Sequence, residues 1–306
     1  MNKPYIAPPS LKPGDLIRIL APSGYIQANK VDAAIHSLHN AGFITLASPT
    51  AYKQHYIFSG TDEERLLDLQ NALDDPQCKA ILMTRGGYGL LRIIDRLNFE
   101  KFHQFPKWII GFSDITVLHS RLHQLGFQSL HATMCAGFYE EDTSPETLQT
   151  FFTALKGGVL NYTVPYDAAN VLGDADAVLC GGNAAMLSSL SGSKDDINTD
   201  GKVLFLEEVG EYLYRFDRIF YTLKRSGRLE NIAGLIVGGL SDMKNGDTPF
   251  GKTPHELIRD ILGDKKIPIC FNFPAGHISD NRALIFGRKI QLKVDKNQSH
   301  IIFVND

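Results

Sequence analysis

Residues 107–126 read KWIIGFSDITVLHSRLHQLG, and this stretch decides the fold class. Its first part, 107–112, is a short apolar run of the kind found in strands that are buried on both faces of a parallel sheet. An apolar stripe at helical spacing follows: Ile115, Leu118, Leu122 and Leu125. Gly126 is a typical helix stop. The stretch therefore predicts a strand that leads directly into a helix, with Ser113 at the turn between them.

Similar pairs of strand and helix occur through the first half of the chain. A strand is expected at 16–22 with a helix at 29–42, and the apolar run at 80–84 also leads into a helical pattern. Thr61 and Glu64 have the spacing of a capping box, which predicts the start of another helix. This alternation predicts an α/β fold with a parallel sheet of the Rossmann or flavodoxin-like type.

The pattern changes around residues 156–172, where glycines, a proline and asparagines interrupt any long helix. Beyond this point, strands are expected at 203–210 and 234–240 with an amphipathic helix between them. We therefore expect an N-terminal α/β domain over residues 1–160 and a mixed α/β C-terminal domain over residues 161–306.

Composition limits the classes of partner. The chain has 306 residues, 43% of them hydrophobic, and 31 basic against 34 acidic side chains give a net charge of −3. This balance disfavours nucleic acid as a partner. No apolar run approaches the ~18 residues of a membrane span, so a cytoplasmic protein that does not contact membranes is expected. The cysteines are scattered without a CxxC pair, which indicates buried thiols in a reducing compartment: Cys78, Cys135, Cys180 and Cys270.

Residues 246–253 fit the phosphate-loop formula GxxxxGK[ST], which raises the alternative of a nucleotide-binding ATPase. The context disfavours it, because five residues separate the loop from the preceding strand and Pro249 lies within it. Thr253 and Glu256 also form a capping box, with Pro254 at the first helical position. Thr253 therefore has a structural role that needs no nucleotide.

His119 and His123 share a helix face at the i, i+4 spacing of metal ligands. However, Ser120 replaces the glutamate of the HExxH motif, and no third ligand suggests itself. We interpret the two histidines as core or solvated residues, and we expect neither a metal nor a cofactor.

Ser113 ends a buried strand and opens a helix, like the serine of a nucleophile elbow. Its hydroxyl is expected at the carboxyl edge of the sheet, where the helix N-terminus supplies N–H donors and about half a positive charge. Asp114 follows and the second glycine of GxSxG is missing, so the α/β-hydrolase formula fails. The alternative is that Ser113 is only an N-cap in a catalytically inert binding protein.

Other strand ends and turns supply compatible groups. The RGGYG turn, 85–89, follows a strand, and its glycines allow close backbone approach to a ligand. Glu207 and Glu208 end an apolar strand, and a Pro-Ala-Gly turn precedes His277. A serine, an acid and a histidine are the parts of a nucleophile, an orienting group and a base. The residues alone leave open which of the two glutamates would act.

At these residues the chain resembles the LD-carboxypeptidases, a serine peptidase family that includes muramoyltetrapeptide carboxypeptidase and the microcin C self-immunity peptidase. The resemblance covers nearly the whole chain, in blocks that occur in the family's order: LKPGDLIRILAPSG, GTDEERLLDLQNAL, RGGYGLLRIID, GFSDITVLH, GGNAAMLSSLSG, LFLEEVGEYLYRFDR and FPAGHISDN.

The resemblance implies a role for each candidate residue. Ser113 would be the nucleophile, His277 the general base and acid, and Glu207, the first acid of its pair, the carboxylate that orients the imidazole. The backbone N–H groups of Gly87 and Asp114 would form the oxyanion hole. The implied reaction is release of a terminal D-alanine through an acyl-enzyme.

The resemblance further implies a small murein tetrapeptide as substrate, in peptidoglycan recycling, and a homodimer as the assembly. Arg85 is a candidate partner for the substrate carboxylate because it lies beside the oxyanion turn. The family usually carries His-Gly-Pro-Met where residues 131–134 read His-Ala-Thr-Met. This departure bears on the substrate, and the alternative substrate is a peptidyl or aminoacyl nucleotide conjugate of the microcin C type.

Overall fold

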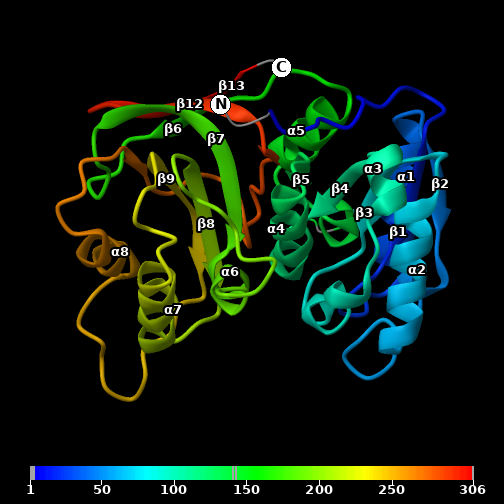
Figure 1. The fold of residues 1–306 in the computed structure, drawn as a ribbon, viewed down its shortest axis with the longest axis horizontal. Coiled ribbons are helices and arrows are strands. Elements are labelled where there is room, and N and C mark those ends of the chain that lie inside the picture. The colour runs from blue at the N-terminus through cyan, green and yellow to red at the C-terminus, as the bar shows by residue number, and fades with distance from the viewer. Residues whose placement is uncertain (1–3, 140, 142, 305–306) are drawn as a thin grey trace.

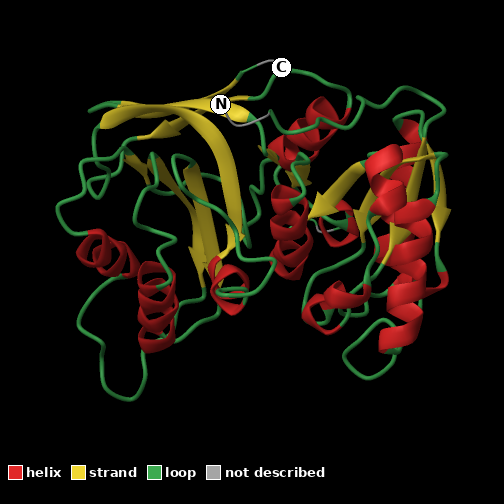
Figure 2. Ribbon diagram, in the orientation of Figure 1, coloured by secondary structure: helices red, strands yellow, loops and turns green. Residues whose placement is uncertain are grey.

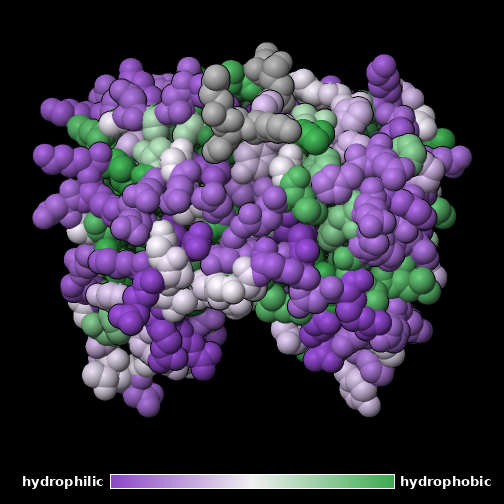
Figure 3. All heavy atoms as spheres, in the orientation of Figure 1, coloured by the Kyte–Doolittle hydropathy of each residue, from purple (hydrophilic) through white to green (hydrophobic). Residues whose placement is uncertain are grey.

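The computed structural model describes residues 4–139, 141 and 143–304. Two sheets stand side by side, and helices flank each of them (Figures 1 and 2). The space-filling view shows that the molecule is hollowed at its lower edge, between the two parts (Figure 3). Among the helices of the described residues, none has the length and apolar character of a membrane span.

The first sheet has the strand order β11-β5-β4-β3-β1-β2. Its strands are β1 (Leu16–Leu20), β2 (Ile44–Ala47), β3 (Cys78–Met83), β4 (Trp108–Gly111), β5 (Ser129–His131) and β11 (Leu284–Phe286). The pairs from β2 to β5 are parallel, and only β11 pairs antiparallel, with β5. The order 2-1-3-4-5 is that of flavodoxin-like folds, so the predicted fold class is confirmed.

Helices cover both faces of this sheet, since the crossovers between parallel strands run over its faces. They are α1 (Ala28–Asn40), α2 (Asp62–Asp74), α3 (Glu100–Gln104), α4 (Thr116–Gln124) and α5 (Pro145–Leu155), with short 3₁₀ turns η1 (Pro49–Ala51), η4 (Ser113–Ile115) and η5 (Cys135–Phe138). The capping box of Thr61 and Glu64 is present at the start of α2.

The prediction of a helix directly after β3 is wrong. The chain instead forms two 3₁₀ turns, η2 (Leu90–Arg92) and η3 (Ile94–Arg96). Gly89 enters them with a φ of 153°, and the N–H of Leu90 donates to the side chain of Asp114. These constraints fix the start of the segment in a turn rather than in a continuous helix.

The second sheet has the strand order β10-β9-β8-β7-β12-β13-β6. Strands β7 to β10 pair in parallel, whereas β12, β13 and β6 add antiparallel pairs, as expected for a mixed domain. The strands are β6 (Asn161–Pro165), β7 (Gly173–Asn183), β8 (Val203–Val209), β9 (Gly234–Ser241), β10 (Ile269–Cys270), β12 (Lys289–Val294) and β13 (Gln298–Phe303). The helices are α6 (Ala184–Ser189), α7 (Leu213–Arg225) and α8 (Pro254–Leu262).

The two sheets share buried apolar packing. One core cluster extends from Ile17 and Ile110 of the first sheet to Phe205 and Ile290 of the second. Strand β11 lies far along the chain yet completes the first sheet beside β5. Because β11 comes from the second half of the chain but belongs to the first sheet, the division into residues 1–160 and 161–306 remains a proposal.

Candidate active site

Ser113 lies where β4 meets the turn η4, at the carboxyl end of the strand. Its φ is 64°, in the left-handed region that non-glycine residues adopt only at a cost of about 1–2 kcal/mol. The N-cap of this turn is Phe112, so the interpretation of Ser113 as an N-cap is wrong. Such strain persists where the surrounding structure fixes it, and it is common at functional sites.

The RGGYG turn packs directly against Ser113. A Cβ at Gly86 would lie 2.8 Å from the Cβ of Ser113 and 2.9 Å from its Oγ, so only glycine leaves room for this side chain. Gly87, with a φ of 101°, follows. Both glycines and Ser113 line the same cavity, so the turn brings the backbone beside the serine hydroxyl.

Asp114 holds this arrangement through its side chain. The buried carboxylate accepts hydrogen bonds from the Ser23 hydroxyl at 2.5 Å and from the N–H of Leu90 at 2.9 Å. Burial raises the pKa of Asp114. The N–H of Gly24 also donates to the carbonyl of Gly86 at 3.0 Å. The loop after β1, the RGGYG turn and the serine turn are therefore joined in one network.

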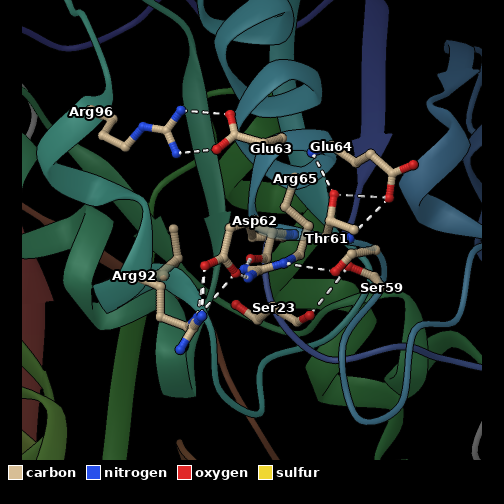
Figure 4. Close-up of polar contacts among 12 residues, drawn as sticks. Ser23, Ser59, Thr61, Asp62, Glu63, Glu64, Arg65, Arg92 and Arg96 are labelled. Atoms are coloured by element: carbon tan, nitrogen blue, oxygen red, sulfur yellow. Dashed lines mark hydrogen bonds and ion pairs between the residues drawn. The ribbon is translucent and has the colours of Figure 1, made fainter.

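A buried arginine supports the loop after β1. Arg65 of α2 is fully buried and donates to the carbonyl of Pro22 and to Asp62. Arg92 reaches the same aspartate at 2.7 Å, and Figure 4 shows these side chains converging beside Ser23. A Cβ at Gly89 would lie 2.5 Å from the Arg65 guanidinium, so this glycine allows the close packing.

Glu207 of β8 contacts His277, which lies in the segment after β10. The fully buried carboxylate of Glu207, at the end of β8, accepts a hydrogen bond from Nδ1 of His277 at 2.7 Å. Gly276 makes this approach possible, because a Cβ there would lie 2.8 Å from the Glu207 side chain. Burial alone would lower the pKa of His277, but the hydrogen bond and charge of Glu207, with the charge of Glu208, raise it above its usual value.

Glu208 has a different set of partners. It accepts hydrogen bonds from Asn183 Nδ2 at 2.9 Å, from the N–H of Ala185 at 2.7 Å and from its neighbour Val209 at 3.0 Å. Burial raises its pKa to about 7. Of the two glutamates that the sequence left open, Glu207 is therefore the one that is bonded to the histidine.

A cavity of about 650 Å³ brings the two parts of the site together. Ser113 and His277 both line it, as do Arg85 and Gly87. The ring of Phe112 packs edge-on against that of His277, with centroids 4.9 Å apart. The turns that carry Ser113 and His277, which are far apart in sequence, thus line the same cavity.

The HATM segment contributes only in part to this cavity. All four residues are buried, but Thr133 and Met134 line the cavity whereas His131 and Ala132 do not. The ring of His131 lies among those of Phe112, Phe205 and Phe286, and burial holds its pKa well below the usual value. The departure from the family pattern therefore falls partly on the wall of the site.

The residues of the phosphate-loop match contact other protein groups. The loop is exposed, and Lys252 forms an ion pair with Asp260. The predicted capping box of Thr253 and Glu256 at the start of α8 is confirmed.

The two histidines of α4 also form contacts with other protein groups. His119 contacts Ser129 Oγ and the carbonyl of Gly111, both at 2.8 Å, and His123 contacts the Tyr5 hydroxyl at 2.7 Å. Both histidines are core residues, as we interpreted them.

Two supporting residues were not recognised in the sequence. Ser23 and Arg65 act through partners far away in the chain. The Ala-Pro-Ser-Gly run after the first strand indicated a turn at Ser23, since such a run ends a strand. Gly86 and Gly276 lie in turns that the sequence indicated, but what packs against them became visible only in the structure.

Two family models match the chain. The LD-carboxypeptidase N-terminal domain matches residues 17–132, and the C-terminal domain matches residues 176–292. A Bacillus subtilis (strain 168) protein named "Probable murein peptide carboxypeptidase" is 30% identical over 92% of this chain and 90% of its own length. The murein tetrapeptide carboxypeptidase of Pseudomonas aeruginosa is 28% identical over 90% of this chain and 92% of its own length.

Solved structures agree. The muramoyltetrapeptide carboxypeptidase from Oxalobacter formigenes superposes with a TM-score of 0.87 at 27% identity, covering 95% of this chain and 99% of that chain. The microcin C7 self-immunity protein MccF, in complex with aspartyl sulfamoyl adenosine, has a TM-score of 0.85 at 21% identity, over 96% of this chain and 97% of that chain, and shows the shared fold. The chain belongs to the LD-carboxypeptidase family and is a serine-type carboxypeptidase.

Proposed function

We propose that this chain releases the terminal D-alanine of a murein tetrapeptide through a Ser113–His277–Glu207 triad and an acyl-enzyme. The observation that carries the proposal is the 2.7 Å bond between His277 Nδ1 and Glu207. Because this bond occupies Nδ1, the other ring nitrogen, Nε2, remains for the Ser113 hydroxyl on the same cavity.

Acylation follows from these positions. Ser113 Oγ attacks the carbonyl carbon of the scissile bond while His277 Nε2 accepts its proton. The buried carboxylate of Glu207 stabilises the imidazolium that forms. The oxyanion accepts hydrogen bonds from the N–H groups of Gly87 and Asp114, and each such donor contributes about 3 kcal/mol to the transition state.

The leaving group then departs with the same proton. The C–N bond breaks, His277 donates the proton to the amine of D-alanine, and the acyl group stays on Ser113. Water attacks the ester carbonyl while His277 again acts as the base. The raised pKa of His277 favours the imidazolium that forms when the ring accepts the proton of Ser113.

Arg85 supports carboxypeptidase rather than endopeptidase specificity. Its side chain lines the catalytic cavity, whose lining contains no aspartate or glutamate among the described residues. A guanidinium matches a carboxylate with paired N–H donors. We therefore assign Arg85 to the substrate's terminal carboxylate, and charge reversal there should mainly raise KM.

The substrate assignment draws on the relatives. The Pseudomonas aeruginosa relative is named a murein tetrapeptide carboxypeptidase, and we extend that substrate to this chain. We also place the reaction in the cytoplasm, in peptidoglycan recycling, and propose a homodimer. Cell fractionation and sedimentation velocity test these two assignments independently of activity.

The decisive assay measures D-alanine release from L-Ala-γ-D-Glu-diaminopimelate-D-Ala at neutral pH. We expect the wild type to release D-alanine and the His277→Ala variant to lose this activity while staying folded. An aminoacyl sulfamoyl adenosine serves as the second substrate. Cleavage of that conjugate alone by folded wild type would overturn the murein assignment but keep the triad.

A further inference from the structure

The residues of the proposed triad come from two different sheets, and helix α4 lies between these sheets (Figure 1). Ser113 follows β4 of the first sheet, whereas Glu207 belongs to β8 of the second. Thr116 is the first residue of α4, and its side chain is fully buried. The contacts of Thr116 therefore bear on how far the nucleophile lies from the acid–base pair.

The backbone of Thr116 is bonded to the turn that carries Ser113. Its N–H donates to the carbonyl of Ser113 and closes the turn η4. This turn has only three residues, and the φ of 64° at Ser113 is one that few side chains tolerate. A displacement of Thr116 is therefore passed on to Ser113, because no flexible segment separates them.

The side chain of Thr116 is bonded to the second sheet. Its Oγ1 accepts a hydrogen bond from the backbone N–H of Asn183 at 3.0 Å. At the preceding residue, Gly182, a Cβ would lie 2.5 Å from both Oγ1 and Cγ2 of Thr116, so the backbone of β7 touches this side chain. Asn183 is in turn the register partner of Glu207 in the parallel pair of β7 and β8.

Asn183 is itself firmly held. Its Oδ1 accepts a hydrogen bond from the N–H of Met186 at 3.1 Å, and its Nδ2 donates to Glu208 at 2.9 Å. Thr116 is thus bonded on one side to Ser113 and on the other to a fixed residue beside Glu207.

We propose that Thr116 is a positioning residue, which fixes the spacing between Ser113 and the pair of Glu207 and His277. This inference rests on the proposed function. The spacing matters because His277 accepts the proton of Ser113 only within hydrogen-bond reach. Without the Thr116 hydroxyl, the N–H of Asn183 would lose its bond in a buried place, which favours a shift of α4 away from β7.

Three variants at this position test the proposal in the tetrapeptide assay. Thr116→Val keeps the shape of the side chain but removes the acceptor, and Thr116→Ala removes the acceptor together with the methyl group. Both should lower kcat about tenfold with little change in KM, since a displacement well below 1 Å is expected. Thr116→Ser keeps the acceptor and should restore most of the turnover.

Two further readouts separate positioning from a general loss of structure. The bond between Glu207 and His277 remains in Thr116→Val, so the pH at which activity rises should be that of the wild type. A fluorophosphonate reacts with Ser113 when the serine oxygen displaces fluoride and His277 accepts its proton. This reaction needs no bound peptide, and it should slow by the same factor as kcat.

Ser120→Ala is the matched control. Ser120 lies one turn further along α4, is also fully buried, and its hydroxyl donates to the carbonyl of Asp195 in the segment after α6. Its loss should lower the unfolding temperature, as in Thr116→Val, but should leave kcat close to that of the wild type. An equal loss of kcat in both variants, or no rescue by Thr116→Ser, would overturn the inference.

The proposed function fails separately. If the wild type neither releases D-alanine nor reacts with the fluorophosphonate at Ser113, the triad is wrong and the inference falls with it. If the wild type reacts at Ser113 but cleaves no tetrapeptide, the murein assignment falls, and the labelling rates still test Thr116. If the wild type does both and folded Thr116→Val matches it, only the role of Thr116 is overturned.

Discussion

The two sides of the candidate active site are built by different physical means. On the side of Ser113, the proposed nucleophile, backbone conformation sets the geometry: Ser113 has a φ of 64° and packs against Gly86 with no room for a Cβ. On the acid–base side, a buried charge sets it, since Glu207 is fully enclosed and bonded to His277.

Because of this difference, the two sides should be sensitive to different kinds of substitution. The nucleophile turn depends on the absence of side chains, so adding one methyl group disturbs it. The histidine turn depends on a charge, so an isosteric neutral residue disturbs it without moving any atom far. Substitutions that separate shape from charge therefore test the comparison.

The largest effect is expected at the nucleophile. Ser113→Ala and Ser113→Gly should both lower kcat by about 10⁴-fold or more, because each removes the attacking oxygen. The two variants should differ in stability. Glycine accepts positive φ without strain, so Ser113→Gly should unfold at a higher temperature than Ser113→Ala, by the equivalent of about 1 kcal/mol. Calorimetry beside the kinetic assay checks both statements.

The next effect is expected at the buried charge. Glu207→Gln should lower kcat by up to about 10⁴-fold, because the amide neither stabilises the imidazolium nor fixes the tautomer. In the wild type, activity should rise with pH through the raised pKa of His277, since the base acts in its neutral form. In Glu207→Gln this rise in activity should occur at lower pH, because burial then lowers the pKa of His277 without the opposing effect of the Glu207 charge.

Glu208→Gln is the control for that experiment. It carries the same change one residue away, on a side chain bonded to Asn183 and to backbone N–H groups. It should retain most activity. If the pH at which activity rises is the same in Glu207→Gln as in the wild type, Glu207 does not raise the pKa of His277, and the assignment is contradicted.

A smaller effect is expected from shape alone. Gly86→Ala places a Cβ 2.8 Å from that of Ser113, so the nucleophile must shift, and kcat should fall about 10²-fold. Gly246→Ala is the matched control, because its nearest neighbour would be 3.9 Å away. Unchanged turnover in Gly86→Ala would show that the turn does not position Ser113.

The smallest effect concerns stability against pH. The pKa of Glu208 is raised to about 7 from an ordinary value of 4.5, so its contribution to stability is full below about pH 4.5 and is lost as pH rises through 7. The pKa of His277 is also raised, so its contribution to stability is likewise lost as pH rises above its ordinary pKa of 6.5. Thermal unfolding of Glu208→Gln should therefore depend less on pH between about 5 and 8, by up to about 3 kcal/mol.

Local patterns predicted the parts of the fold that depend on local physics. The run at 107–112 became β4, and the turn carrying Ser113 lies at its end. The capping boxes at Thr61 and Thr253 both formed, because each needs only residues three apart. The parallel pairing of the first sheet also followed from alternating strands and helices.

The remaining features depend on contacts between distant segments. Strand β11 pairs with β5 across more than half the chain, and no local pattern indicates that partner. The helix expected after β3 gave way to 3₁₀ turns because Asp114 holds the N–H of Leu90. The residues alone did not separate Glu207 from Glu208, and the resemblance to the family chose Glu207. In the structure, Glu207 is the one bonded to His277, which comes from a different turn.

The central claim is that Ser113 forms an acyl-enzyme with the help of His277. The most direct measurement is mass spectrometry of wild-type protein that is acid-quenched during turnover of the tetrapeptide. We expect a mass increase equal to the tetrapeptide less D-alanine, localised to the peptide that contains Ser113. An adduct on another residue, or undiminished D-alanine release by Ser113→Ala, would contradict the account.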